Sequence, residues 1–180
     1  MKQFATAVFF LIVGILLVPV AGLIYLNYGH PPVAVADAAF PMEAAVVHNP
    51  LHHRMEAENA GNSPVPVNEA TLVEGANVYA TQCAFCHGAP NKPSKVGANT
   101  YPSVPQLWER HHDGKVVGVS DDPAGETYWK VKNGIRLTGM PSYQKVITDE
   151  QMWEVSNLLA TADKPMPDSV TKILAEIPQN

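Results

Sequence analysis

The chain has 180 residues and a formal net charge of −5 at pH 7, and hydrophobic residues make up 46 % of it. This length suits about one folded domain with additional segments, and the mild negative charge argues against a nucleic-acid-binding protein, which normally carries a basic face. Cys83 and Cys86 are the only two cysteines, and because they lie three residues apart they cannot form a disulfide framework across the fold.

The first predicted element is an apolar helix at the N-terminus. Residues 4–28 contain no charged side chain, and about 20 apolar residues in a helix are enough to cross a bilayer core. Lys2 precedes the segment, and no Lys or Arg follows it before Arg54. The positive-inside rule then places the N-terminus in the cytoplasm and the rest of the chain outside. We therefore predict that residues 1–28 are an uncleaved signal anchor in the cytoplasmic membrane.

A cleaved signal peptide is the alternative interpretation of this segment. Ala34-Val35-Ala36 has the small residues of a cleavage site. It lies several residues beyond the apolar run, however, and Pro31 and Pro32 intervene. The apolar run is also longer than the core of an ordinary signal peptide, so the retained anchor is favoured over cleavage after Ala36.

Residues 29–67 are predicted to form a flexible linker. The stretch is rich in Pro, Ala, Val, Asn and His and lacks a sustained helical or alternating pattern, so any helical turns in it should be transient. Pro64-Val65-Pro66 ends it with a stiff, extended piece. His48, His52 and His53 could bind a metal ion, but a flexible linker offers no rigid element to hold the ligands in geometry.

The folded domain is predicted to span residues 68–180 and to begin with a helix. Asn68 can cap that helix through its side chain, and apolar residues then recur at helical spacing as far as Cys83. The helix therefore leads directly into Cys83-Ala84-Phe85-Cys86-His87.

This pentapeptide has the spacing of a c-type haem attachment site. Two thiols separated by two residues can form thioether bonds to the two vinyl groups of one haem, and the next residue, His87, is then held beneath the iron as an axial ligand. A zinc site would need a second Cys or His pair at motif spacing, which the sequence lacks. A thioredoxin-like redox pair would follow a strand pattern, also lacking here, and a plain local disulfide is the remaining alternative. We predict one covalent haem c with its iron.

Methionine is a common second axial ligand of the haem in electron carriers. Met140 lies between a glycine and a proline, which makes its segment a shaped loop rather than a helix. A thioether on such a loop can approach the iron from the face opposite His87. Met140 could instead fill a gap in the core, and His111 or His112 could supply a second histidine ligand. Their charged surroundings favour a solvated surface, so Met140 is the preferred candidate.

Three further helices are predicted beyond the attachment site. Asp122 followed by proline predicts the start of a helix over residues 123–132. Thr148-Asp149-Glu150-Gln151 is a capping box for a helix that runs to about residue 162. Residues 168–177 add a short amphipathic helix.

On these residues, the domain resembles a class I c-type cytochrome, in a membrane-anchored bacterial mono-haem form. The resemblance covers about residues 68–163 and rests on three motifs: Cys83-Ala84-Phe85-Cys86-His87-Gly88, the stretch from Asn133-Gly134 to Gly139-Met140-Pro141, and Pro105-Gln106-Leu107, which is similar to the family's P-x-L. It implies that the Pro105 carbonyl accepts a hydrogen bond from the axial histidine and orients it, with Leu107 beside the haem.

The resemblance extends to the crossing of two helices. Gly75 and Tyr79 resemble the glycine and aromatic pair on the family's first helix, and Trp153 resembles the aromatic residue on its last. In the family these helices cross closely because the glycine permits the approach. His111, His112 and the loop over 115–125 match no motif of the family.

The resemblance implies an all-α fold, with a small cytochrome c domain of three to five helices around one covalent haem, preceded by a single transmembrane helix and a linker. It implies a one-electron carrier with His/Met axial ligation rather than an enzyme, either as a shuttle or as an electron-transfer subunit of a respiratory or dehydrogenase complex. Its partners would be redox proteins or such a membrane complex, met on the periplasmic side. The alternatives are a haem enzyme or gas sensor in which Met140 leaves the iron, and a non-haem metal or structural protein.

A basic stretch flanks the Met140 loop. Lys130, Lys132, Arg136 and Lys145 could steer an acidic partner toward it. A solvated helix face explains the same residues at least as well.

Overall fold

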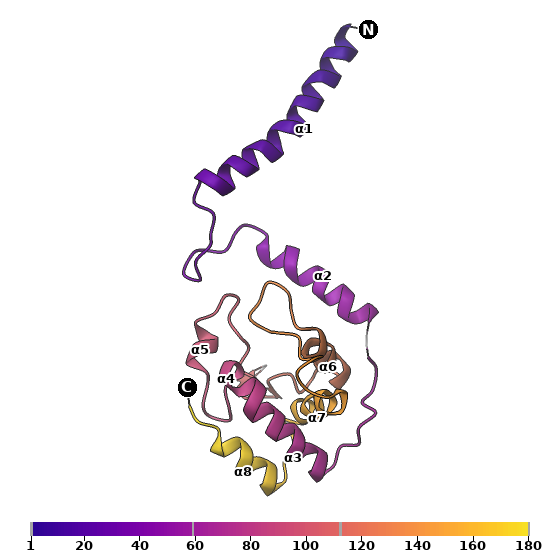
Figure 1. The fold of residues 1–180 in the computed structure, drawn as a ribbon, viewed down its shortest axis with the longest axis vertical. Helices are drawn as coiled ribbons and strands as arrows, with labels where there is room; N and C mark the ends of the chain where they lie inside the picture. Colours follow the sequence, from indigo (N-terminus) through magenta and orange to yellow (C-terminus); the bar gives the residue numbers. More distant parts are fainter. Residues whose placement is uncertain (1, 59, 112, 180) are drawn as a thin grey trace. The chain divides into compact units, whose positions relative to one another are not determined.

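The computed structural model describes residues 2–58, 60–111 and 113–179. The chain forms two compact units, Met1–Val47 and His48–Asn180, and helices dominate both (Figure 1). The predicted all-α class is confirmed, with one short hairpin added.

The first unit contains the long helix α1 (Lys2–Tyr28), in which Pro19 is accommodated without ending the helix. This helix buries none of its side chains within the protein, and among the described residues it is the one helix long and apolar enough to cross a membrane. An apolar surface of this kind is costly in water, which is consistent with a membrane anchor. After the helix, the Asp37 carboxylate accepts hydrogen bonds from the backbone N of Val33 and Ala34, each 2.8 Å long, and these bonds lower its pKa.

A helix, α2 (Glu43–Ala57), occupies the middle of the predicted linker. The sequence predicts only transient turns there, and that expectation is wrong. The C-terminal end of α2 is stabilised by tertiary contacts, because Met55 is only 5 % exposed and Glu58 accepts a hydrogen bond of 2.9 Å from Trp129 Nε1. Helices whose local sequence is marginal commonly depend on such packing.

The chain that follows α2 belongs to the second unit and is bonded to a later part of it. Asn157 Nδ2 donates to Ser63 Oγ at 3.0 Å and to the carbonyl O of Val65 at 3.1 Å. The part of the predicted linker next to the domain is therefore tied to it at several points, rather than free along its whole length.

The domain consists of helices joined by loops. Its elements are α3 (Glu69–Val78), a π-helical turn η1 (Tyr79–Cys83), α4 (Ala84–His87), α5 (Lys95–Ala98), α6 (Ala124–Asn133), α7 (Asp149–Ala160) and α8 (Asp168–Glu176). The first three continue into one another without a break, so the described part of the domain has five separate helical segments, as the resemblance implies.

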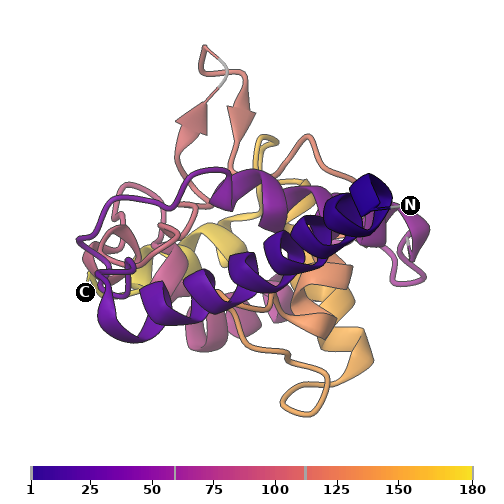
Figure 2. The same ribbon diagram turned by 90° about the horizontal axis from the view of Figure 1, so that it is seen from above.

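Two short strands are a feature of the domain that the sequence did not predict, as are the short helix α5 and the π-helical turn η1. β1 (Arg110–His111) pairs with β2 (Val116–Val117) in antiparallel register, and Figure 2 shows the hairpin projecting from the helices. It lies in the part of the sequence that matches no family motif. His112 falls outside the described residues.

The helix starts follow the predicted caps, with one exception. Asn68 accepts a hydrogen bond of 3.1 Å from Thr71 N, and Thr148 accepts one of 3.2 Å from Gln151 N, so both helices begin with a side-chain cap. Helix α6 instead begins one residue later than predicted, because Pro123 has an extended ψ of 138° and lies outside it. The side chain of Asp122 therefore does not cap α6.

The core lies where α3, α6 and α7 meet. A Cβ added to Gly75 would lie 2.5 Å from the carbonyl O of Glu154, so α3 and α7 cross with almost no space between their backbones. Tyr128 on α6 stacks on Trp153 on α7, with ring centroids 4.0 Å apart. The close crossing that the resemblance implies is present, and it fixes the helix that leads to Cys83.

Candidate functional site

The helix leading to the two cysteines is widened just before it reaches them. In η1 the backbone N of Ala84 donates to the carbonyl O of Tyr79, five residues earlier. Such a π-helical turn inserts an extra residue into a helix and is frequent at functional sites. It changes the direction in which Cys83 and the following α4 residues project relative to α3.

Cys83 and Cys86 are free thiols in the structure, each half-buried. Burial raises the pKa of Cys83 to about 12, and the neighbouring Cys86 adds to the effect. Cys83 also packs against the main apolar core. The Cys83 side chain therefore lies at the edge of the core, where an apolar group attached to its sulfur would be partly enclosed.

His87 is held in one orientation by a backbone carbonyl. Its Nδ1 lies 2.8 Å from the carbonyl O of Pro105. Burial lowers the pKa of His87, and this hydrogen bond offsets part of that effect. A neutral ring that donates from Nδ1 keeps the lone pair of Nε2 free for a metal, the usual arrangement of a histidine ligand.

The segment of the P-x-L motif is fixed beside His87 by further bonds. Leu107 N donates to the carbonyl O of His87 at 3.2 Å, and the Leu107 side chain is 7 % exposed. Gln106 Oε1 accepts a hydrogen bond of 2.7 Å from Ser94 N. The structure thus brings Pro105 and Leu107 into contact with His87, while their role toward a haem stays a prediction.

Met140 lies on a loop between α6 and α7, as predicted. Gly134 opens the loop with a φ of +67°, and a Cβ there would lie 2.6 Å from Ser142 N, so only glycine fits without strain. Inside the loop, Ile135 N donates to the carbonyl O of Met140 at 3.2 Å, and Met140 N donates to Thr138 Oγ1 at 3.1 Å. The Met140 side chain is half-buried against the same core as Cys83.

One hydrogen bond joins the Met140 loop to the cysteine segment. Tyr143 Oη donates to the carbonyl O of Gln82 at 2.7 Å, and Gln82 directly precedes Cys83. Sequence reasoning missed this residue, although an aromatic side chain three positions after Met140 was a signal for it.

Gly97 is a second residue that sequence reasoning missed. A Cβ at this position would overlap the carbonyl O of Cys86. Glycine therefore lets α5 lie directly against the segment that holds the thiols. No motif in the sequence pointed to this contact.

Other candidate residues lie elsewhere. The ring of His111 contacts the carbonyl O of Gly118 within the hairpin, and His112 lies outside the described residues. In the basic stretch, Lys130 Nζ pairs with Glu126 at 2.7 Å and with Asp122 at 3.4 Å. Part of that stretch is therefore neutralised locally, which favours the solvated helix face over a docking patch.

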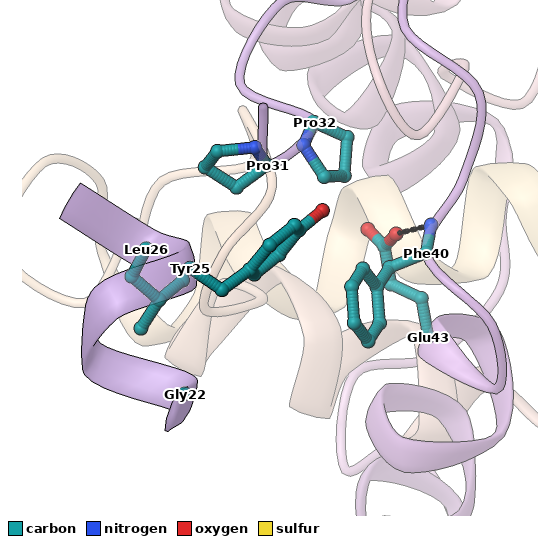
Figure 3. Close-up of a pocket in the computed structure, with 7 residues that line it drawn as sticks. All are labelled: Gly22, Tyr25, Leu26, Pro31, Pro32, Phe40 and Glu43. Carbon is teal, nitrogen blue, oxygen red and sulfur yellow. Dashed lines mark hydrogen bonds between the residues drawn. The ribbon is translucent and has the colours of Figure 1, made fainter. Parts of the chain in front are cut away.

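A pocket of about 440 Å³ lies within the first unit and belongs to a different part of the chain (Figure 3). Its wall combines the end of α1 with the segment that follows, and its lining residues are Gly22, Tyr25, Leu26, Pro31, Pro32, Phe40 and Glu43. The Glu43 carboxylate accepts a hydrogen bond of 2.8 Å from Phe40 N, so it is occupied in shaping the backbone. None of these lining residues belongs to the site around Cys83.

The donor set at the Cys83 site fits a covalent haem. Two free thiols at the required spacing, a histidine with Nδ1 already bonded, and a thioether on a constrained loop next to the same core are the groups that a c-type haem with two axial ligands requires. The half-buried state of Cys83 and Met140 suits an apolar macrocycle.

The match to one protein-family model agrees with this chemistry. The family model described as cytochrome c oxidase, cbb3-type, subunit III matches residues 70–159, which include all the site residues from Cys83 to Met140. The reducing HAO-like protein complex of Kuenenia stuttgartiensis is similar in structure, with a TM-score of 0.43 and 15 % identity over 78 % of this chain and 55 % of that chain. The chain thus spans about half the length of the chain it matches there. No curated protein matches the sequence.

Proposed function

Because the chain belongs to the c-type cytochrome family described as cytochrome c oxidase, cbb3-type, subunit III, we propose that its domain holds one haem c with His/Met axial ligation. Membership of this family makes the chain a haem-based electron-transfer protein. The observation that supports the proposed ligation best is the hydrogen bond of 2.8 Å between His87 Nδ1 and the Pro105 carbonyl, directly after the two free thiols. Such a bond from Nδ1 is the usual way in which a metal-binding histidine is oriented.

Each site residue has a separate role in this proposal. Cys83 and Cys86 would form the two thioether bonds, and His87 Nε2 would bind the iron. Pro105 fixes the His87 ring, and Met140 would supply the second protein ligand. The bound haem contributes an iron that accepts and returns one electron.

Electron transfer fits the site better than catalysis does. If His87 and Met140 both bind the iron, no position on it would be open to a substrate. The Met140 loop has bonds to its own backbone, to α6 and to the cysteine segment, which favours a permanent ligand. A haem enzyme or gas sensor with a displaceable methionine is the second candidate.

We further propose that α1 anchors the domain to the outer face of the cytoplasmic membrane, with the N-terminus inside. Residues 1–28 would be the anchor, and the stretch 29–67 would link it to the domain, with its flexible part before α2. A tethered domain of this kind serves a redox protein or a respiratory or dehydrogenase complex in the same membrane.

An absorption spectrum of the full chain, purified in mild detergent, separates the candidates. The proposal expects one covalent haem per chain, a low-spin spectrum, and in the oxidised protein a methionine-to-iron charge-transfer band. A high-spin spectrum would support the enzyme or sensor instead. A protein without haem after expression with the haem-attachment machinery would exclude both.

A further inference from the structure

Tyr143 connects three parts of the domain. Its hydroxyl donates to the carbonyl O of Gln82 at 2.7 Å, and its backbone N donates to the carbonyl O of Val131 at 3.0 Å. The ring packs against the main apolar core. One residue thus ties the end of the Met140 loop to α6 on one side and to the segment before Cys83 on the other.

The two segments that Tyr143 joins, the cysteine segment and the Met140 loop, differ in how each would be attached to the haem. A haem attached through Cys83 and Cys86 would stay next to His87, because the thioether bonds are covalent and His87 directly follows Cys86. Met140 has no such attachment, and its distance from the iron depends on the position of its loop. The internal bonds of the loop, from Ile135 N to Met140 O and from Met140 N to Thr138 Oγ1, fix its shape but not its place relative to the cysteine segment.

We propose that Tyr143 is a positioning residue for Met140. The Tyr143 hydroxyl holds the Met140 loop against the segment that would bear the haem. This inference rests on the proposed His87/Met140 ligation. The hydroxyl bond belongs only to the closed state of the loop, in which the thioether reaches the iron. Loss of the bond shifts the equilibrium toward an open state in which the sixth position is accessible.

The size of this shift in the equilibrium between the closed and the open loop follows from the free-energy contribution of one hydrogen bond. Removing a typical intramolecular hydrogen bond changes an equilibrium by roughly two- to tenfold. An external ligand that binds only the open state has an apparent affinity proportional to the population of that state. Imidazole should therefore bind the oxidised Tyr143→Phe variant more tightly than the parent by roughly the same factor.

The experiment uses the full haem-loaded chain in detergent. Tyr143→Phe removes the hydroxyl and keeps the ring in the core, so the fold is retained. Tyr128→Phe is the matched control, because the Tyr128 hydroxyl donates to Asp149 on α7 and accepts from Lys132 on α6, and neither bond involves the cysteine segment. Imidazole titration, the charge-transfer band and the reduction potential are measured for all three proteins.

The expected result is a roughly two- to tenfold lower dissociation constant for imidazole in Tyr143→Phe, a weaker charge-transfer band, and a lower potential. Tyr128→Phe should keep the parent's values. The inference is overturned if Tyr143→Phe matches the parent, or if Tyr128→Phe shifts as far, since the effect would then be general loosening. A parent without the charge-transfer band would instead refute Met140 ligation itself, and this outcome is visible before any variant is made.

Discussion

Replacing Gly75 with alanine tests the crossing of α3 and α7. A Cβ at this position would lie 2.5 Å from the carbonyl O and 2.8 Å from the carbonyl C of Glu154, whereas ordinary contact begins at 3.4 Å. The shortfall in the closest contact is 3.4 − 2.5 = 0.9 Å. The opposing atoms are helix backbone, so no side-chain rotation relieves the overlap, and the two helices have to separate.

Two effects oppose each other in Gly75→Ala. Alanine favours a helix over glycine by about 1 kcal/mol. Forcing extra volume into a well-packed contact costs about 1–3 kcal/mol. The cost of Gly75→Ala should lie near the upper end of this range, because the added Cβ meets backbone atoms that cannot rotate away. We therefore expect the free energy of unfolding to fall by about 2 kcal/mol, which lowers the melting temperature by roughly 10 °C in a domain of this size.

Thermal unfolding of the haem-loaded protein, followed by circular dichroism, measures this loss. Asn77→Ala is the matched control, because residue 77 is exposed on the same helix and the change alters little besides helix propensity. If Gly75→Ala is as stable as the parent, or more stable, then the backbones of α3 and α7 do not approach each other closely at Gly75, and the expected loss of stability is refuted.

Three further predictions concern the haem, its sixth ligand and the anchor. Because both thiols should form thioether bonds, the haem should stay with the chain through denaturation and acid-acetone extraction; haem found in the organic layer would contradict the c-type assignment. Met140→Ala should keep its haem, bind carbon monoxide readily when reduced, and have a lower potential because the thioether favours reduced iron. The control Met152→Ala, at a side chain 1 % exposed in the core, should instead cost about 2–5 kcal/mol of stability, and a Met140 variant with the parent's spectrum and potential would show that another residue is the ligand. The mature protein should fractionate with membranes and begin at or near Met1, whereas a soluble product starting at Asp37 would establish signal-peptide cleavage.

Local patterns in the sequence predicted much of the fold. The caps at Asn68 and Thr148 were identified correctly because a capping side chain bonds to a backbone N only a few residues away. The loop character of Met140 followed in the same way from its neighbouring glycine and proline. The start of α6 was displaced by one residue, since Asp122 followed by proline is equally compatible with a helix that begins after the proline.

Features that depend on distant contacts were missed. Helix α2 was not predicted, because its stability involves Met55 in a buried position and the bond between Glu58 and Trp129, 71 residues away. The hairpin of β1 and β2 was missed because two-residue strands are too short to show an alternating pattern. The ion pair between Lys130 and Asp122 joins side chains eight residues apart, and no local pattern in the sequence indicates it.

The sequence by itself determined the chemistry of this protein: the thiol spacing and adjacent histidine that predict haem attachment, the apolar N-terminal helix, and the helical character of the domain. Each of these is encoded within a short window, where covalent geometry or helix period fixes the result. Only the tertiary structure decided which segments meet. Pro105 lies 18 residues from His87, and Tyr143 lies 61 residues from Gln82, so the orientation of the histidine ring and the place of the Met140 loop depend on packing of the whole domain around the α3–α7 crossing.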